Sequence, residues 1–478
     1  MVNKSTQYEN IIILGGGIPG VFSALYLSKL NPNWNIHLIE SSKQIGGLYN
    51  SFNHQEGGTF DKGMHIIYET CISEIDSIIR DCLHKDEWLY LEGNYKDIAG
   101  VFHNKKLEKD SPYMHIDSLN KRKLNICLGD FLKTLEKQAP NFKECSNSEE
   151  FFQKRFGPLL TKELIEPVIQ KLWGRPLNKL HPSSTRIVLM DRLRMFSEET
   201  TSDLMKSEFI RSRIAYPNQM KLEKKYRNSQ RGLYPKKFGM SNLIKGMEIN
   251  LEKSGIQVHR NSNISSIEVS NNLIRRVSIK TNNSFIELDS IKLLHSTISS
   301  SNLLPLFGIN HKKVKLDKSH IQKYVYFLID SQPNMGDLYY FFSFQQGSKL
   351  YRVTNYAAYC PSAIRIHKGI KAWPICIELH YKNKNPNDKE ILNDGISELL
   401  KTKVIQSSKS IIFSKVESAG GFPLLTLRNC AYLQESNSLL ENLKLENLLI
   451  AGQAPDKGIF FLHDILKNIF ELINNKLS

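Results

Sequence analysis

The sequence has 478 residues, 41% of them hydrophobic and 23% charged, and its 64 Lys and Arg against 48 Asp and Glu give a formal net charge of +16. This length favours two interleaved domains over a single core, and the composition is that of an ordinary soluble globule. No apolar run reaches the roughly 18–20 residues that span a bilayer, and no signal peptide is visible, so we expect neither a transmembrane nor a secreted protein. Seven scattered cysteines without a C-x-x-C pair argue against zinc and disulfides and predict a cytoplasmic protein without a metal site.

A glycine-rich turn follows the first predicted element, a buried strand at residues 11–14. Gly15 permits a tight turn, Gly17 lets the backbone approach a pyrophosphate, and Gly20 lets the next helix pack on the strand. A second apolar strand then ends in Glu40, where a carboxylate accepts hydrogen bonds from a ribose diol. Strand, turn, helix, strand and acid together predict a dinucleotide-binding fold.

Paired glycines after Glu40 narrow this prediction. Gly46 and Gly47 serve no purpose in an NAD site, whereas a flavin needs the chain to pass close under its pyrophosphate and ribityl arm. With the later Gly63-Met64-His65, this stretch resembles the two-dinucleotide-domain flavoproteins, which include amine oxidases, protoporphyrinogen oxidase and UDP-galactopyranose mutase. The resemblance implies bound FAD and places His65 beside the flavin ring.

The rest of the chain alternates helical and strand patterns. Apolar spacing of three to four residues predicts helices within residues 76–231. A turn at 232–240 then leads into an amphipathic helix. Short alternating runs predict the strands of a meander at residues 256–258, 264–269, 273–279 and 285–288. Two further apolar runs, at 291–297 and 447–452, predict buried strands. Aromatic residues alternate between 324 and 376, which predicts an antiparallel sheet that lines a pocket.

Two further segments carry the resemblance. The strand at 256–258 is similar to one whose backbone contacts the adenine end of the flavin, which implies a contact from Val258. Gly452-Gln453 resembles the last turn of the superfamily, where Gln453 replaces an acid that binds the ribityl chain; an amide can still hydrogen-bond a hydroxyl.

The predicted fold is therefore α/β, with a Rossmann-like FAD-binding domain interleaved with a substrate domain. We assign residues 8–75, 232–300 and 440–478 to the FAD-binding domain, 76–231 to a helical insertion and 301–439 to the antiparallel substrate-binding domain. The cofactor contacts that the motifs and the resemblance imply are Gly15, Gly17, Ile18, Pro19, Gly20, Glu40, Ser41, Gly46, Gly47, Leu48, Gly63, Met64, His65, Val258, Gly452, Gln453, Gly458, Ile459 and Phe460.

Some segments resemble the mutases in particular. Gly63-Met64-His65-Ile66-Ile67 is similar to their Gly-Pro-His-Ile-Phe, and residues 171–174 to their Lys-Gln-Trp-Gly. Residues 458–464 are close to Gly-x-Tyr-x-Tyr-x-Asp but lack both tyrosine hydroxyls. Arg186 and Arg352 would then clamp a diphosphate, because Arg gives bidentate contacts to phosphate.

Three functions follow from the resemblance. The first is an FAD-dependent oxidoreductase of the amine oxidase and protoporphyrinogen oxidase type, with hydride transfer from the substrate to flavin N5. The candidate catalytic residues are His65, Arg186 and Arg352, of which the two arginines matter for the mutase described next and need not matter for this oxidoreductase. The second is a flavin-dependent mutase acting on a nucleotide sugar in cell-surface polysaccharide synthesis. The third is a non-enzymatic escort protein of the same architecture, which the intact glycine fingerprint disfavours.

A basic block between Arg211 and Lys237 contains Glu223 as its only acid. It could contact an anionic lipid surface, an anionic small-molecule substrate or only solvent. No nucleic-acid-binding module is visible and aromatic residues do not alternate with the basic ones, so we expect no nucleic-acid partner. Substrate and oligomeric state stay open at this point.

Overall fold

The computed structural model describes residues 9–96, 98–187, 190–227, 230–282, 284–311, 314–382, 385–418 and 423–477. The predicted domain ranges also include residues outside this description, namely 8, 97, 188–189, 228–229, 283, 312–313, 383–384, 419–422 and 478.

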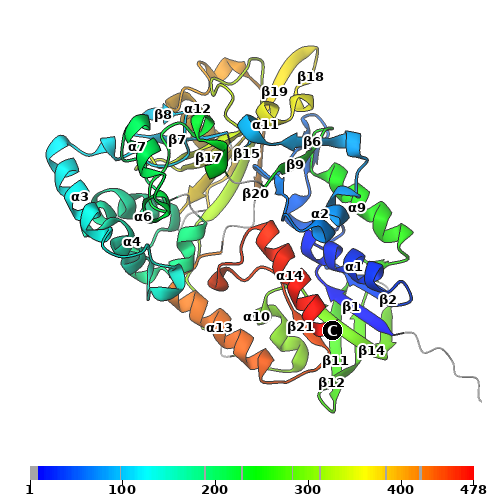
Figure 1. Cartoon of the computed structure of the whole chain (residues 1–478). Helices are drawn as coiled ribbons and strands as arrows, with labels where there is room; N and C mark the ends of the chain where they lie inside the picture. Colours follow the sequence, from blue (N-terminus) through cyan, green and yellow to red (C-terminus); the bar gives the residue numbers. More distant parts are fainter. Residues whose placement is uncertain are drawn as a thin grey trace, which may run out of the picture.

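A parallel sheet joins strands from both ends of the chain (Figure 1). Its order is β10 (Gln257–His259), β2 (Asn35–Ile39), β1 (Asn10–Leu14), β14 (Ile291–Ser296) and β21 (Leu448–Ile450). Every pairing is parallel, and β1 is buried along nearly its whole length, as a strand covered on both faces must be. These strands confirm the buried strands predicted from the apolar runs.

Helices cover one face of this sheet and a meander covers the other. Ile11, Ile13 and Leu38 pack in the same core as α1 (Ile18–Leu30), α9 (Ser241–Lys253) and α14 (Leu462–Leu477). Ile12 and Leu14 pack instead against the predicted meander, formed by β11 (Asn263–Ser270), β12 (Leu273–Lys280) and β13 (Phe285–Asp289). Successive side chains along β1 therefore pack alternately into two hydrophobic cores, one on each face of the sheet.

A larger, mostly antiparallel sheet lies beside this layered unit (Figure 1). Its order is β20 (Ile411–Ser418), β15 (Ile321–Ile329), β19 (Ile370–Tyr381), β17 (Leu350–Asn355), β16 (Tyr340–Ser343), β7 (Ala99–His103) and β8 (Lys106–Glu108), with β18 (Arg365–His367) paired to β19. Helix α12 (Asp388–Lys401) covers one face, in a core that holds Val325, Phe327 and Ile377. The opposite face carries Tyr326, Phe342 and other aromatic side chains, in the core shared with the parallel sheet.

The segment 76–231 is less uniform than the predicted helical insertion. Strand β7 pairs in parallel with β16, so this segment supplies an edge to the large sheet. Strand β6 (Trp88–Leu91) joins β9 (Gly232–Pro235) and β5 (Ile67–Tyr68) in a small sheet, and β3 (Phe52–His54) pairs with β4 (Gly58–Phe60).

The remaining α-helices of the described chain, within this segment and outside it, are α2 (Ser73–Arg80), α3 (Lys121–Thr134), α4 (Ser148–Phe156), α5 (Pro158–Leu160), α6 (Glu166–Trp173), α7 (Glu198–Leu204), α8 (Glu208–Arg211), α10 (Ser300–Leu303), α11 (Tyr356–Tyr359) and α13 (Leu427–Glu441).

Within the described residues, no helix combines the length and apolar character needed to cross a membrane. All seven cysteines are free thiols.

Candidate functional site

Close packing requires glycine at two of the three fingerprint positions after β1, Gly15 and Gly20. Gly15 has a φ of +110°, and a Cβ there would lie 2.4 Å from the Thr297 hydroxyl. A Cβ on Gly20 would lie 1.8 Å from the Gly15 carbonyl oxygen, so a larger residue would push α1 off the turn. Ile18 is fully buried in the core, and Pro19 occupies the first turn of α1, where its missing N–H costs nothing.

At the third fingerprint position, Gly17, no close packing requires glycine. Gly17 has an ordinary φ of −67°, and a Cβ there would meet only Pro19, at 3.6 Å. The Gly46 N–H donates to the Gly16 carbonyl at 2.8 Å, which lays the paired glycines against the turn, and a Cβ on Gly47 would have Gly17 as its neighbour at 3.6 Å. Because α1 has no side-chain cap, its free N–H groups face this cradle, which suits a phosphate group.

Glu40 lies at the carboxyl end of β2, beside the cradle. Its two oxygens accept the N–H groups of Gly16, at 2.8 Å, and Ser42, at 2.7 Å, while the Ser41 hydroxyl donates to it at 3.4 Å. Val258 pairs with Leu38 on the adjacent strand, so the predicted acid and adenine contact lie on neighbouring strands. Leu48, just beyond Gly47, is largely exposed.

Asp61 holds the Gly63-Met64-His65 segment in place. Its buried carboxylate accepts the hydroxyls of Ser51, at 2.6 Å, and Tyr234, at 2.5 Å, and the Met240 N–H at 2.9 Å, although burial still raises its pKa. The Asp61 backbone carbonyl accepts the Gly63 N–H at 2.9 Å. No role for Asp61 was predicted from the sequence.

His65 is uncharged at neutral pH. Burial, then the nearby Arg352 and Lys62, lower its pKa to about 3. Its Nδ1 is enclosed without a hydrogen-bond partner in the described structure, and its ring meets Tyr49 edge-on at 5.0 Å between centroids. An orphaned nitrogen of this kind is available to a bound group. Met64 is half-buried against the main core.

Arg352 and Glu378 form a buried ion pair on the face of the large sheet that meets Gly63. They are cross-strand neighbours on β17 and β19, with Arg352 Nε donating to Glu378 Oε1 at 2.5 Å. Gln322 donates to the other carboxylate oxygen at 2.7 Å. Burial alone would lower the pKa of Arg352, but the Glu378 carboxylate beside it raises that pKa above its ordinary value.

A Cβ on Gly63, where φ is +76°, would lie 2.7 Å from Glu378 Oε1 and 3.0 Å from Arg352 Nη2. The structure thus brings Arg352 to the predicted flavin-side segment. The sequence analysis missed Glu378, although a lone acid inside the apolar run of β19 is a signal that a partner is required.

Arg186 contacts a different segment, near the start of α14. A tight pairing between Ala454 and Ile459 brings Gly458 against it, so that a Cβ on Gly458 would lie 3.3 Å from Arg186 Cδ. Arg186 Nη2 lies 3.4 Å from an Asp464 carboxylate oxygen. Ile459 and Phe460 are half-buried against the main core, and Gln453 is exposed, whereas a Cβ on Gly452 would lie 2.5 Å from the Thr297 carbonyl oxygen.

In the described part of the chain, no group of three or more His, Cys, Asp or Glu could hold a metal ion. The fold and the cradle together define a nucleotide-binding α/β protein with a second, antiparallel domain packed over the Gly63 segment.

Comparisons with known proteins agree with this class. Residues 13–75 match the family model of an NAD(P)-binding Rossmann-like domain. The chain is 24% identical over 279 residues to coproporphyrinogen III oxidase of Staphylococcus aureus (strain NCTC 8325 / PS 47), a match that covers 54% of this chain and 55% of that enzyme. The chain therefore matches about half the length of this curated relative.

Two solved structures resemble the chain over almost its whole length. Reduced UDP-galactopyranose mutase superposes with a TM-score of 0.71 at 17% identity, covering 98% of this chain and 94% of the mutase. A candidate protoporphyrinogen oxidase from Exiguobacterium sp. 255-15 gives 0.66 at 14% identity, covering 98% and 99%. These likenesses confirm the predicted fold class, a Rossmann-like domain combined with an antiparallel sheet.

Proposed function

We propose that the chain is an FAD-dependent oxidoreductase of the amine oxidase and protoporphyrinogen oxidase type. Gly17 has neither a positive φ nor a close neighbour at its Cβ position, so the cradle that it forms with Gly47, whose φ is +57°, leaves room for a pyrophosphate. Glu40 stands where an adenosine ribose would follow, and Val258 lies on the adjacent strand. When bound, FAD would supply an acceptor at N5 for a hydride, which carries two electrons.

The chain's own residues would enclose and orient the substrate rather than act as strong acids or bases. Met64 and His65 follow Gly63 directly, and Arg352 approaches Gly63 from the large sheet. The Arg352 guanidinium lies 5.8–5.9 Å from the rings of Tyr340, Phe342 and Tyr351. Because burial keeps His65 neutral, it can hydrogen-bond a substrate without adding charge. The Arg352–Glu378 pair fixes one wall of this region.

The main support for an oxidoreductase is that both arginines expected to clamp a diphosphate lie beside carboxylates. Arg352 is bound to Glu378 at 2.5 Å and Arg186 lies 3.4 Å from Asp464, so each already has a carboxylate partner. Each contact uses one of the five N–H donors of its guanidinium, but the carboxylate beside each arginine compensates the positive charge that would attract a diphosphate. This pairing supports an oxidoreductase over a nucleotide-sugar mutase, together with the match to coproporphyrinogen III oxidase.

The mutase remains the second candidate. The superposition on reduced UDP-galactopyranose mutase and the placement of Arg352 beside Gly63 favour it. The complete glycine turn supports a nucleotide-binding enzyme over an escort protein.

Anaerobic reduction tests the two candidates. We expect coproporphyrinogen III, the first substrate to try, to bleach the oxidised flavin without pre-reduction, because two electrons must come to rest on the ring. A mutase would instead convert UDP-galactopyranose only after dithionite has reduced the flavin, and the flavin would still be reduced at the end of each cycle.

The variant Arg186→Gln provides the matched control for this test. The Arg186 side chain is 42% exposed and is not part of the buried Arg352–Glu378 pair, so the substitution leaves that pair intact. An oxidoreductase should keep its rate of bleaching in this variant, whereas a mutase should lose most of its turnover. Turnover of the nucleotide sugar only after reduction, abolished by Arg186→Gln, would overturn the proposal.

A further inference from the structure

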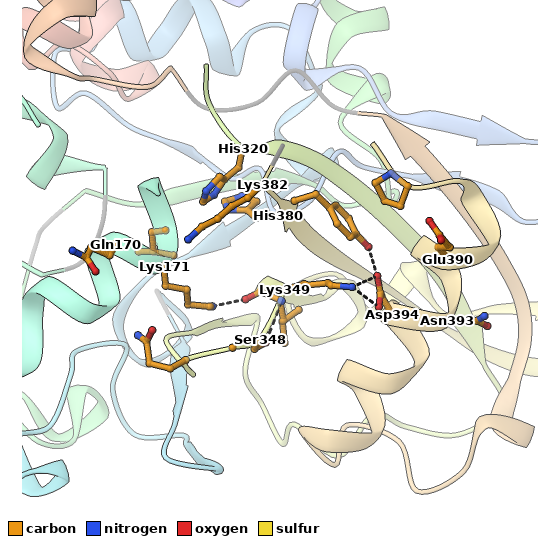
Figure 2. A pocket seen from close by; sticks show the side chains of 16 residues that line it. Gln170, Lys171, His320, Ser348, Lys349, His380, Lys382, Glu390, Asn393 and Asp394 are labelled. Atoms are coloured by element: carbon orange, nitrogen blue, oxygen red, sulfur yellow. Dashed lines mark hydrogen bonds and ion pairs between the residues drawn. The ribbon is translucent and has the colours of Figure 1, made fainter. Parts of the chain in front are cut away.

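A cavity of about 670 Å³ opens where α6 meets the ends of β17 and β19 (Figure 2). Its wall includes Lys171 on α6, His320 ahead of β15, His380 and Lys382 at the end of β19, and Lys349 just before β17. The mechanism proposed above uses none of these five side chains.

Lys171 is held at the cavity by backbone oxygens. Its ammonium donates to the carbonyl oxygen of Leu350 at 2.6 Å and to that of Ser343. An ammonium has three N–H donors, so one remains after these two bonds. Burial lowers the pKa of Lys171 to about 7, and the Glu398 carboxylate opposes that shift.

Two histidines form the neighbouring part of the wall. The rings of His320 and His380 lie 5.6 Å apart. Neither nitrogen of His320 makes a hydrogen bond of ordinary geometry within the described structure, although the Leu172 carbonyl lies near enough to favour its charged form. Gly174 makes room for this ring, since a Cβ there would lie 2.5 Å from His320 Nε2.

Cationic groups surround both rings. Burial first, and then basic neighbours, lower the pKa of His320 to about 4 and that of His380 to about 3. The charged or titratable side chains that act on the two rings, apart from each other, are Lys171, Arg175, Lys382 and Arg352. No acid is among them.

The two acids that line the cavity, Glu390 and Asp394, lie on α12 and both have partners, as does Glu398, which lies on the same helix outside the cavity wall. Asp394 accepts the Lys349 ammonium at 2.8 Å on both oxygens and the Tyr381 hydroxyl at 2.9 Å (Figure 2). Glu398 accepts the Ser348 hydroxyl at 2.8 Å.

Of the cations that act on the histidines, Arg352 is paired with Glu378 and Arg175 lies 3.8 Å from Asp317. Lys171 and Lys382 make no ion pair within the described residues.

We infer that this cavity binds an oxyanion, a carboxylate or a phosphate group, between Lys171, His320, His380 and Lys382. An anion there would accept charge-assisted hydrogen bonds from the ammonium groups and from the neutral imidazoles, and such bonds are about twice as strong as neutral ones. The site adjoins the candidate flavin site, because the Tyr351 ring stacks on His380 at 4.6 Å and lies 5.9 Å from the Arg352 guanidinium.

Isothermal titration calorimetry of the full-length protein, as purified, tests this site with two probes, inorganic phosphate and succinate. We expect one saturable site, with the tighter probe identifying the preferred oxyanion. Binding should weaken about tenfold in Lys382→Gln and in His320→Gln, the effect of losing one charge-assisted hydrogen bond. Lys409→Gln is the control, since it removes one exposed charge outside the cavity.

The pH dependence has a defined sign. Lys171 carries its proton below its pKa of about 7, and an anion favours the charged forms of both histidines. Affinity for succinate, which is mainly dianionic over this range, should therefore be higher at about pH 6 than at about pH 8, whereas phosphate gains a second charge in the same range and does not serve for this comparison. Absence of saturable binding by either probe, or an equal loss in Lys409→Gln, would overturn the inference.

A flavin spectrum recorded on the same samples separates this inference from the proposed function. Colourless protein that still binds the anion at one site would contradict the proposed function alone. Yellow protein without anion binding would contradict only the oxyanion site.

Discussion

At the scale of single residues, the Arg352–Glu378 pair shows what buried charge requires. Glu378 is 1% exposed in its side chain and Arg352 12%, so each carries a desolvation cost that its partner offsets. Gln322 satisfies the second oxygen of Glu378 and helps to fix its orientation.

Replacing only one member of this pair should be costly. We expect Glu378→Leu to lower the free energy of unfolding by about 3–5 kcal/mol, because it leaves the Arg352 charge buried and unpaired. The double variant Arg352→Met with Glu378→Leu should recover most of this loss. Urea unfolding measures both, and equal destabilisation of the single and double variants would show that the charges are not coupled.

Glu40 and Gln453 should differ in their importance for FAD. Charge-assisted hydrogen bonds from a ribose diol contribute about 1.5–3 kcal/mol each, against roughly 0.5–1.5 for a neutral amide contact. Glu40→Ala should therefore weaken flavin retention more than Gln453→Ala in a flavin-release titration.

Glu40→Gln keeps the size of the side chain, but its single amide oxygen can accept only one of the Gly16 and Ser42 N–H groups that Glu40 accepts. It should therefore lower flavin affinity less than Glu40→Ala while still weakening the turn. Equal losses for Glu40→Ala and Gln453→Ala would mean that one of the two roles is misassigned.

At the scale of elements, the glycines of the first turn have two separate roles. Gly20 lies where α1 crosses the turn, and a methyl group there would clash with the Gly15 carbonyl. Gly17 has neither a positive φ nor a close protein neighbour at the Cβ position. One glycine therefore serves packing and the other leaves room for a ligand.

Alanine at the two positions should separate these roles. Gly20→Ala should destabilise the flavin-free protein by about 1–3 kcal/mol or more, the cost of overpacking. Gly17→Ala should leave flavin-free stability nearly unchanged and weaken flavin binding. Thermal unfolding of flavin-free protein, with a flavin titration beside it, measures both. Destabilisation by Gly17→Ala would show that this glycine is structural.

The elements that the sequence could predict are those with local signals. The glycine turn, Glu40 and the strands of the meander each show a short-range pattern, and the structure contains all of them. The parallel pairing of β7 with β16 joins residues more than 230 positions apart, and no local pattern reveals such a partner. The partner of Arg352 depends likewise on the register of β17, where an irregularity lies between Leu350 and Arg352.

At the scale of the whole molecule, the basic block at residues 211–237 presents less unpaired positive charge at the surface than its sequence indicates. Lys221 pairs with Glu198 at 3.0 Å, Lys225 with Glu223 at 2.7 Å, and Arg231 with Glu69 at 2.7 Å. Arg213 is fully buried. Two of these acids lie outside the block in sequence, so counting charges along the chain overstates its capacity for an anionic surface.

Cofactor binding should be visible as global stability, because the parallel sheet joins strands from both ends of the chain. Stripped protein given FAD at 100 times its dissociation constant should gain about 2.7 kcal/mol of unfolding free energy by linkage. FMN should give little gain, since it lacks the adenosine ribose that Glu40 and the cradle fit. Differential scanning calorimetry measures the gain, and denaturation should release FAD from the yellow protein. Release of FMN, or equal stabilisation by FMN, would contradict the assignment of Glu40 to a ribose.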